Sequence, residues 1–182
     1  NSKWVEIYGN EAYDNTGGIL VFDLPGLTTY GHSTKVYQNT IRSNNYKNFA
    51  QKGNIVASIP PGSGMMVLAT HDIEIYDNDF KDNTTVGIAL VSYELVAALN
   101  EGEQEQEGSI GGVQTVNNNY KADSLYNAFP YNVHIHDNRF TNKHWFPNFQ
   151  NDIGKLLAMK SMFNPPDIVY DGIPDPERSE RG

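Results

Sequence analysis

The sequence predicts an all-β fold, a parallel β-helix of stacked coils with inserted loops and a short C-terminal helix. Three observations indicate this fold. First, a short motif recurs at unequal intervals, as VEIYGN at 5–10, KVYQN at 35–39, IEIYDN at 73–78 and VHIHDN at 133–138. Second, apolar and polar residues alternate within each motif, as in a strand with one buried face. Third, nearly continuous apolar runs follow the first three motifs, which is typical of parallel strands covered on both faces.

Length and composition restrict the classes of protein that fit. With 182 residues, we expect a single domain over 1–182. The chain has 13 Lys plus Arg against 22 Asp plus Glu, a formal charge of −9, which disfavours binding to nucleic acid or anionic membranes. No cysteine is present, so disulfides and thiolate metal sites are excluded. No apolar run is long enough to span a bilayer, and no signal peptide is recognisable. Because the chain begins with Asn1 and is strand-like almost at once, we expect it to be part of a longer protein.

The first strand of each coil places its apolar residues inward. The predicted inward residues are Val5, Ile7, Thr34, Val36, Ile73, Ile75, Val133 and Ile135. Each motif closes on an asparagine, and equivalent asparagines on stacked coils can form a hydrogen-bonded amide ladder. The predicted ladder is Asn10, Asn39, Asn78 and Asn138.

A second, shorter strand follows each asparagine. Its inward residues are predicted to be Ala12, Ile41, Phe80 and Phe140. A further asparagine comes after each of these strands. Asparagine readily adopts the left-handed backbone conformation, so we expect these residues to bend the chain. They are Asn15, Asn44, Asn83 and Asn142.

The third strand is aligned on Gly18, Gly64 and Gly87, where the sequence reads GILVFDL, GMMVLAT and GIALVSY. Repetition of such units indicates stacked coils, and the unequal intervals indicate insertions at the corners. One insertion spans 45–63. A second spans 94–130 and contains ELVAALNEGEQEQEG, a short helix followed by an acidic, mobile tract. After 148, Ile153, Leu156, Leu157, Met159 and Met162 predict a short docked helix, and 174–182 reads as a loose tail.

The polar side of the first strand forms two outward columns when the motifs are stacked. One column is aromatic, with Tyr8, Tyr37, Tyr76 and His136. The other is charged, with Glu6, Lys35, Glu74 and His134. Such cross-strand pairs stabilise a sheet by about 0.2–1 kcal/mol each. The aromatic column could simply stiffen the sheet, or it could be a substrate-binding platform for sugar rings.

Three segments resemble a family of exported bacterial right-handed parallel β-helix repeat proteins. They are NTGGILVFDLPGL (15–27), NNYKNFAQKGNIVASIPPGSGMMVLATHDIEIYDN (44–78) and IVYDGIPDP (168–176). The resemblance covers most of 5–92, with 131–142 and 168–176. It implies secretion, with an extracellular, periplasmic or outer-membrane-associated location. At a wider level the coil is similar to the pectate lyase-like superfamily, which implies polysaccharide binding or processing by analogy of fold.

A polyuronate lyase needs a cation to neutralise the substrate carboxylate and a base to remove the adjacent proton. Candidate catalytic residues are Arg42 and Lys47, near the Asn44 corner, and His71, which is followed by Asp72; His32 is a further candidate.

Two metal hypotheses are open from the residues. Asp77 and Asp137 occupy equivalent positions and could bind Ca²⁺, although solvated corner carboxylates are the simpler interpretation. His134, His136 and His144 raise the question of zinc or copper. No third ligand stands at a recognisable spacing, so the sequence assigns no metal site.

These observations favour an exported β-helix that binds or processes polysaccharide, with its groove beside the tyrosine column or the 45–63 insertion. The negative charge disfavours polyanionic glycans unless calcium bridges them. The alternative is a non-catalytic structural or partner-binding module of a cell-envelope or extracellular complex. Its coil ends would stack on flanking coils of a longer chain or on another protein. We expect no nucleic-acid partner and no membrane insertion.

Overall fold

The computed structural model describes residues 1–51, 53–100, 116–141, 151–161 and 166–179. Within these residues, the strands form three sheets in which every pairing is parallel. The first sheet contains β1 (Lys3–Tyr8), β4 (His32–Tyr37), β7 (His71–Tyr76) and β10 (Val133–His136). The second contains β2 (Glu11–Tyr13), β5 (Thr40–Arg42), β8 (Asp79–Lys81) and β11 (Arg139–Thr141). The third contains β3 (Gly17–Phe22), β6 (Ser63–Leu68), β9 (Val86–Val91) and β12 (Ile168–Tyr170).

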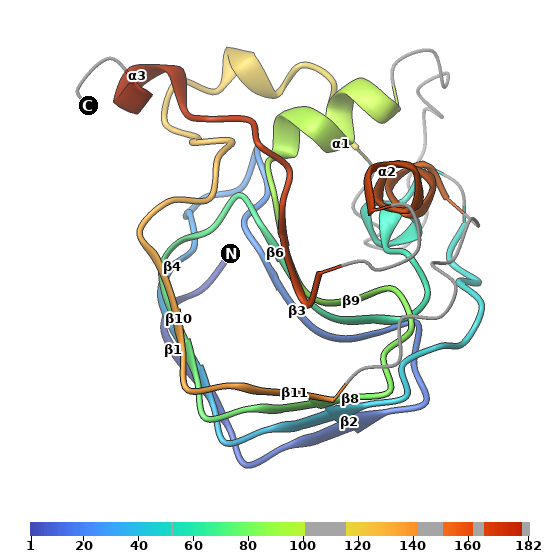
Figure 1. Cartoon of the computed structure of the whole chain (residues 1–182). Coiled ribbons are helices and arrows are strands. Elements are labelled where there is room, and N and C mark those ends of the chain that lie inside the picture. The colour runs from blue at the N-terminus through green and yellow to red at the C-terminus, as the bar shows by residue number, and fades with distance from the viewer. Residues whose placement is uncertain (52, 101–115, 142–150, 162–165, 180–182) are drawn as a thin grey trace.

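The chain visits the three sheets in turn, and each visit adds one strand to each sheet. Figure 1 shows the sheets as three walls around a common interior. The register is the one that the recurring motifs predict, because Ile7 pairs with Val36, Val36 with Ile75, and Ile75 with Ile135. The mostly β, parallel arrangement is consistent with the predicted β-helix.

The interior is filled by the predicted inward residues. Val36, Ile41, Ile75 and Phe80 are fully buried and belong to one apolar cluster with residues of the third sheet. Phe80 stacks on Phe140 with ring centroids 5.0 Å apart. Burying each large aliphatic side chain stabilises the fold by about 1.5–3 kcal/mol.

Two amide ladders run along the interior corners. The predicted ladder is present, with side-chain amides bonded from Asn10 to Asn39, Asn39 to Asn78, and Asn78 to Asn138 at 2.9–3.0 Å. A second ladder joins Asn15 to Asn44 and Asn44 to Asn83.

The prediction that Asn15, Asn44 and Asn83 adopt the left-handed conformation is wrong. The residues with φ near +54° are the ones before them, Asp14, Ser43 and Asp82. The bend thus falls one position earlier, which turns each following asparagine inward, where its amide meets the next coil. Asn142 lies outside the described residues.

Glycine is required where the third sheet approaches the interior corner. A Cβ on Gly64 would lie 2.6 Å from the carbonyl oxygen of Gly87 and 2.9 Å from the Phe80 ring. A Cβ on Gly18 would lie 2.5 Å from the carbonyl oxygen of Gly64. The aligned glycines therefore keep the coils in close contact.

Short helices cover the outer face of the third sheet. They are η1 (Ile55–Ser58), α1 (Tyr93–Leu99) and α2 (Asp152–Ser161), with η2 (Tyr120–Ala122) further along the 94–130 insertion. Ile153 and Leu157 of α2 and Tyr93 of α1 share a second apolar cluster with Met66 and Leu68 of β6. This cover explains why β6 is buried along its whole length, as its apolar sequence predicted. The helices predicted after 93 and 148 are confirmed (Figure 1).

The last described helix contacts the segment just before β10. Within the predicted loose tail, α3 (Pro176–Ser179) places the Arg178 guanidinium 3.6 Å from the centre of the Tyr131 ring. The acidic tract after 100 and residues 180–182 lie outside the described residues. None of the described helices has the length and apolar character to cross a membrane.

Candidate functional site

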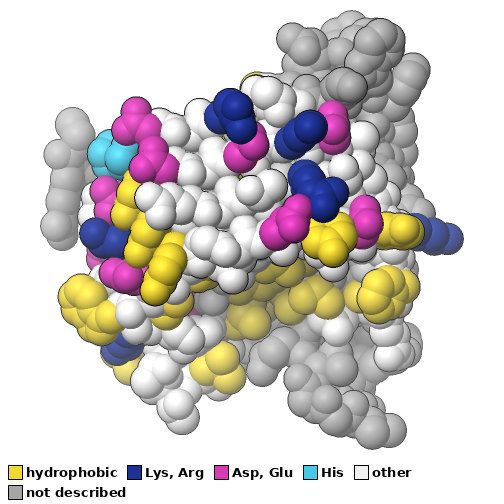
Figure 2. Space-filling model, turned by 90° about the horizontal axis from the view of Figure 1, so that it is seen from below, with side chains coloured by type: hydrophobic (Ala, Val, Ile, Leu, Met, Phe, Trp, Pro, Cys, Tyr) yellow, Lys and Arg dark blue, Asp and Glu magenta, His cyan; other side chains and the backbone are white. Residues whose placement is uncertain are grey.

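An aromatic column runs across the outer face of the first sheet. Tyr8, Tyr37 and Tyr76 stack on one another, and His136 stacks on Tyr76. Neighbouring ring centroids are 5.0–5.2 Å apart and the ring planes differ by 3–9°. Figure 2 shows a row of hydrophobic side chains beside a histidine and several acidic side chains at one side of the molecule. The column has the predicted members; its role in sugar binding stays a prediction.

The rings cover one another's faces, so the column presents ring edges and hydroxyl groups to solvent. Tyr8, at the end of the column, is 56% exposed. A sugar ring could stack on Tyr8, but elsewhere it would contact ring edges and exchange hydrogen bonds with the phenol groups.

A charged row lies beside the aromatic column. Lys35 Nζ is 3.2 Å from Glu74 Oε2, and the Tyr37 hydroxyl donates a hydrogen bond of 3.2 Å to Glu6. The hydrogen bond from Lys35 lowers the pKa of Glu74, and the same contact raises the pKa of Lys35. Charges therefore alternate along the row, and each charged group has a partner of opposite sign or a hydroxyl.

Where the row passes from β7 to β10, three side chains that could bind a metal lie close together. One ligand atom from each of Glu74, His134 and His136 lies within 4.8 Å of the other two. His136 Nε2 is 3.5 Å from Glu74 Oε1, and its Nδ1 is 2.8 Å from Asp137 Oδ2. The contact with Asp137 raises the pKa of His136. Sequence reasoning considered the two histidines but missed Glu74, and His144 lies outside the described residues.

A second aromatic column, which sequence reasoning missed, lies at the start of the same strands. His32 and His71 stack with centroids 5.4 Å apart, and His71 stacks on Tyr131 at 4.4 Å. Trp4 meets the His32 ring edge-on and is 79% exposed. The sequence does indicate this stacking, because His32 and His71 both stand two places before the first inward residue of their strands.

His71, a predicted catalytic residue, is enclosed by this column. Its Nδ1 is 2.8 Å from Asp72 Oδ2, and its ring lies between those of His32 and Tyr131. The pKa of Asp72 is lowered, first by the hydrogen bond from Asn132 and then by the one from His71. Asp72 therefore remains an ionised partner that can orient the imidazole.

Arg42 and Lys47 lie elsewhere. Arg42 belongs to the second sheet, where its Nε bonds to Glu11 Oε1 at 2.7 Å and its guanidinium lies 4.3 Å from the centre of the Tyr13 ring. The contact with Glu11 raises the pKa of Arg42. Figure 1 shows the first and second sheets as separate walls, so the structure does not combine Arg42 with His71 in one site.

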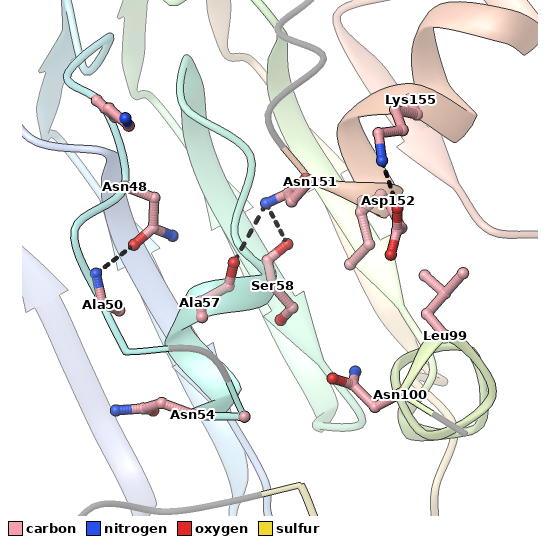
Figure 3. Close-up of a pocket in the computed structure, with 13 residues that line it drawn as sticks. Asn48, Ala50, Asn54, Ala57, Ser58, Leu99, Asn100, Asn151, Asp152 and Lys155 are labelled. Carbon is pink, nitrogen blue, oxygen red and sulfur yellow. Dashed lines mark hydrogen bonds and ion pairs between the residues drawn. The ribbon is translucent and has the colours of Figure 1, made fainter. Parts of the chain in front are cut away.

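Lys47 lines an open cavity of about 550 Å³ beside the third sheet. Figure 3 shows the cavity between the 45–63 insertion, the end of α1 and the start of α2. Side-chain amides link the segments around the cavity. Asn151 donates to the carbonyl oxygens of Ala57 and Ser58, and Asn48 donates to that of Val56. Lys155 is 2.8 Å from Asp152 at the rim. These contacts occupy the Asn151 amide and the Asp152–Lys155 pair, and a catalytic role for Lys47 stays a prediction.

The calcium hypothesis stays a prediction. Asp137 accepts a hydrogen bond from His136, and Asp77 is at the equivalent corner of the preceding coil. In the described part of the chain, neither belongs to a cluster of three close acidic or histidine ligands.

No family model, curated protein or solved structure matches this chain. The resemblance to exported β-helix repeat proteins and the location that it implies remain predictions. The geometry of the first sheet is therefore the basis for a functional proposal.

Proposed function

We propose that this chain is a right-handed parallel β-helix module of an exported protein that binds polysaccharide along the outer face of the first sheet. The observation that carries the proposal is the regular column of Tyr8, Tyr37 and Tyr76 on the outer face of the first sheet, spaced 5.0–5.1 Å apart. Tyr8 is exposed, and Tyr37 and Tyr76 are half-buried. This spacing is close to the length of one pyranose unit. A linear glycan lying along the column would meet an equivalent phenol at each successive sugar.

The chemistry of the face suits sugar hydroxyls. A phenol both donates and accepts hydrogen bonds, and the neighbouring ammonium group of Lys35 donates them. The ring edges provide apolar contact for the C–H groups of the sugar. Because the chain carries a formal charge of −9, neutral glycans are favoured over polyuronates unless calcium bridges the charges.

Binding is better supported than cleavage. A lyase would need a cation and a base at one substrate position. Of the three predicted catalytic residues, His71 alone lies on the first sheet, and its ring is covered on both sides by His32 and Tyr131. If the chain is a polyuronate lyase, incubation with polyuronate should produce the ultraviolet absorbance of unsaturated uronate products. Arg42→Ala, Lys47→Ala or His71→Ala should then abolish this absorbance.

The binding proposal is tested by titrating neutral and acidic glycans, with calcium and with chelator, by calorimetry. The double variant Tyr37→Phe/Tyr76→Phe keeps the stacked rings and removes two hydroxyls. At about 0.5–1.5 kcal/mol per hydrogen bond, we expect roughly tenfold weaker binding. Tyr46→Phe is the matched control, because Tyr46 is exposed on the 45–63 insertion, away from the first sheet. Equal affinities of the double variant and the wild type, or a loss confined to Tyr46→Phe, would contradict the proposal.

A second function is favoured by the first coil. Its strands β1, β2 and β3 are edge strands of their sheets, and Trp4, Tyr13 and Leu20 are exposed on them. Edge strands with apolar side chains are surfaces on which flanking coils of a longer chain or another β-structure can add. This structural role predicts concentration-dependent association in sedimentation velocity, weakened by Trp4→Glu. A chain that stays monomeric at every concentration would contradict self-association through this edge.

A further inference from the structure

We propose that Glu74, His134 and His136 form a binding site for a divalent transition-metal ion of the zinc type. The site goes beyond the proposed function, since it requires no glycan. The donor set is two imidazole nitrogens and one carboxylate oxygen. Zinc accepts these ligands, whereas calcium and magnesium are bound by oxygen.

The distances suit a mononuclear site. Zinc–nitrogen and zinc–oxygen bonds of about 2.0–2.2 Å in a tetrahedron place ligand atoms about 3.3 Å apart. His136 Nε2 and Glu74 Oε1 are already 3.5 Å apart, and all three ligand atoms lie within 4.8 Å. Small side-chain rotations therefore bring the third ligand into range. A water molecule can complete the tetrahedron, because the face is open to solvent.

The backbone positions the ligands before any metal arrives. His134 lies directly opposite Glu74 in the β7–β10 pairing, and His136 lies opposite Tyr76. His134 and His136 are two residues apart on one strand, so they point to the same face. Their ring centroids are 4.4 Å apart. The Tyr76 ring lies under His136 with planes 3° apart, which fixes the orientation of that imidazole.

Asp137 prepares His136 for metal binding. With Asp137 Oδ2 2.8 Å from its Nδ1, the neutral imidazole carries its proton on Nδ1. The Nε2 lone pair is then free and faces Glu74. Metal-bound histidines commonly have such a carboxylate partner, and its loss typically weakens metal binding 10–100-fold.

Replacing Lys35 tests whether a cation binds at Glu74, because the Lys35 charge should oppose such binding. Its ammonium group is 3.2 Å from Glu74 Oε2 and leaves Oε1 for the metal. A positive charge so close to the bound cation opposes binding. Replacing Lys35 by the neutral Gln should therefore tighten zinc binding, whereas a stack of histidines that only stiffens the sheet predicts no such effect.

The experiment is calorimetric titration of the untagged 182-residue chain with ZnCl₂ at about pH 8, because the contact with Asp137 raises the pKa of His136 above the ordinary histidine value of about 6.5. Absorption after CoCl₂ addition reports the ligand geometry. We expect one zinc per chain with micromolar affinity. Glu74→Gln should weaken it at least tenfold, Asp137→Asn about 10–100-fold, and Lys35→Gln should strengthen it.

Glu6→Gln is the matched control. Glu6 occupies the same row two coils away and faces the Tyr37 hydroxyl rather than histidines, so zinc affinity should not change. Circular dichroism melts establish that each variant is folded. Unchanged affinity in folded Glu74→Gln, or zinc binding that is lost in His71→Gln instead, would overturn the proposal. Millimolar or weaker binding to the wild type would do the same.

Discussion

Asn78→Ala is the most direct test of how the coils are held together. The Asn78 side chain is 2% exposed and bridges three coils. Its Nδ2 donates to Val36 O at 2.9 Å and to Asn138 Oδ1 at 2.9 Å. Its Oδ1 accepts from the backbone N–H and the side-chain amide of Asn39, at 3.1 and 2.9 Å. Alanine removes all of these bonds.

The cost follows from the groups that lose their partners. Among the described residues, the backbone N–H of Asn39 has no other acceptor, and burying such a group unpaired costs about 1–3 kcal/mol. The remaining bonds contribute about 0.5–1.5 kcal/mol each. We therefore expect Asn78→Ala to lower the free energy of unfolding by about 3–4 kcal/mol. For a chain of this size, the melting temperature should fall by roughly 10 °C.

Asn10→Ala is the matched control for this measurement. Asn10 is exposed on the first coil, and its side chain donates to Tyr8 O and Asn39 Oδ1 without accepting from a further coil. Its loss should cost about 1 kcal/mol or less. Urea unfolding followed by circular dichroism gives both values. If the two substitutions cost the same, the ladder does not derive its strength from continuity between coils, and the reasoning fails.

Three further predictions concern the interior. Ile75→Asp places a carboxylate at a fully buried position, so the chain should not fold; a native-like circular dichroism spectrum and melt would refute the register. Gly64→Ala forces a methyl group to 2.6 Å from a backbone oxygen and should cost about 2–3 kcal/mol in urea unfolding; an unchanged transition would contradict the close approach of the coils. Burial raises the pKa of Asp23 from 3.8 to about 6. Its protonation therefore stabilises the fold below pH 3.8, and this contribution is lost as pH rises through about 6. The stability of Asp23→Asn relative to the wild type should increase by up to about 3 kcal/mol between pH 4 and 7, and a decrease would contradict the assignment.

The register of the coils was predictable because apolar and polar residues alternate with a period of two within each motif. Alternation in VEIYGN and IEIYDN determines which residues point inward, and alignment of the closing asparagines determines which residues meet. The inward column, the amide ladder and the tyrosine column follow from these two facts. Each depends on local sequence and stacking alone, so no knowledge of the insertions was needed.

Features that depend on contacts between distant segments were not predictable in this way. The cavity at Lys47 exists because α2 packs beside the 45–63 insertion, and no period relates these segments. Arg42 was a candidate for catalysis because it stands near a corner, yet its charge is directed to Glu11 on the neighbouring coil. The turn geometry was misassigned because both Asn and Asp tolerate the left-handed conformation, and the amide ladder requires the asparagine inside.

The ligands of the proposed metal site come from two adjacent coils. Sequence spacings typical of one strand or one loop reveal no third ligand for His134 and His136. In parallel coils the nearest side chain is the one at the same register on the adjacent coil, however far away in sequence, and for His134 that residue is Glu74. On β10, both outward columns are occupied by histidine, His134 in the charged column and His136 in the aromatic one. Both imidazoles therefore lie beside the single carboxylate of Glu74. A stacked coil can therefore gain a site through two changes in one repeat, without any change in its interior.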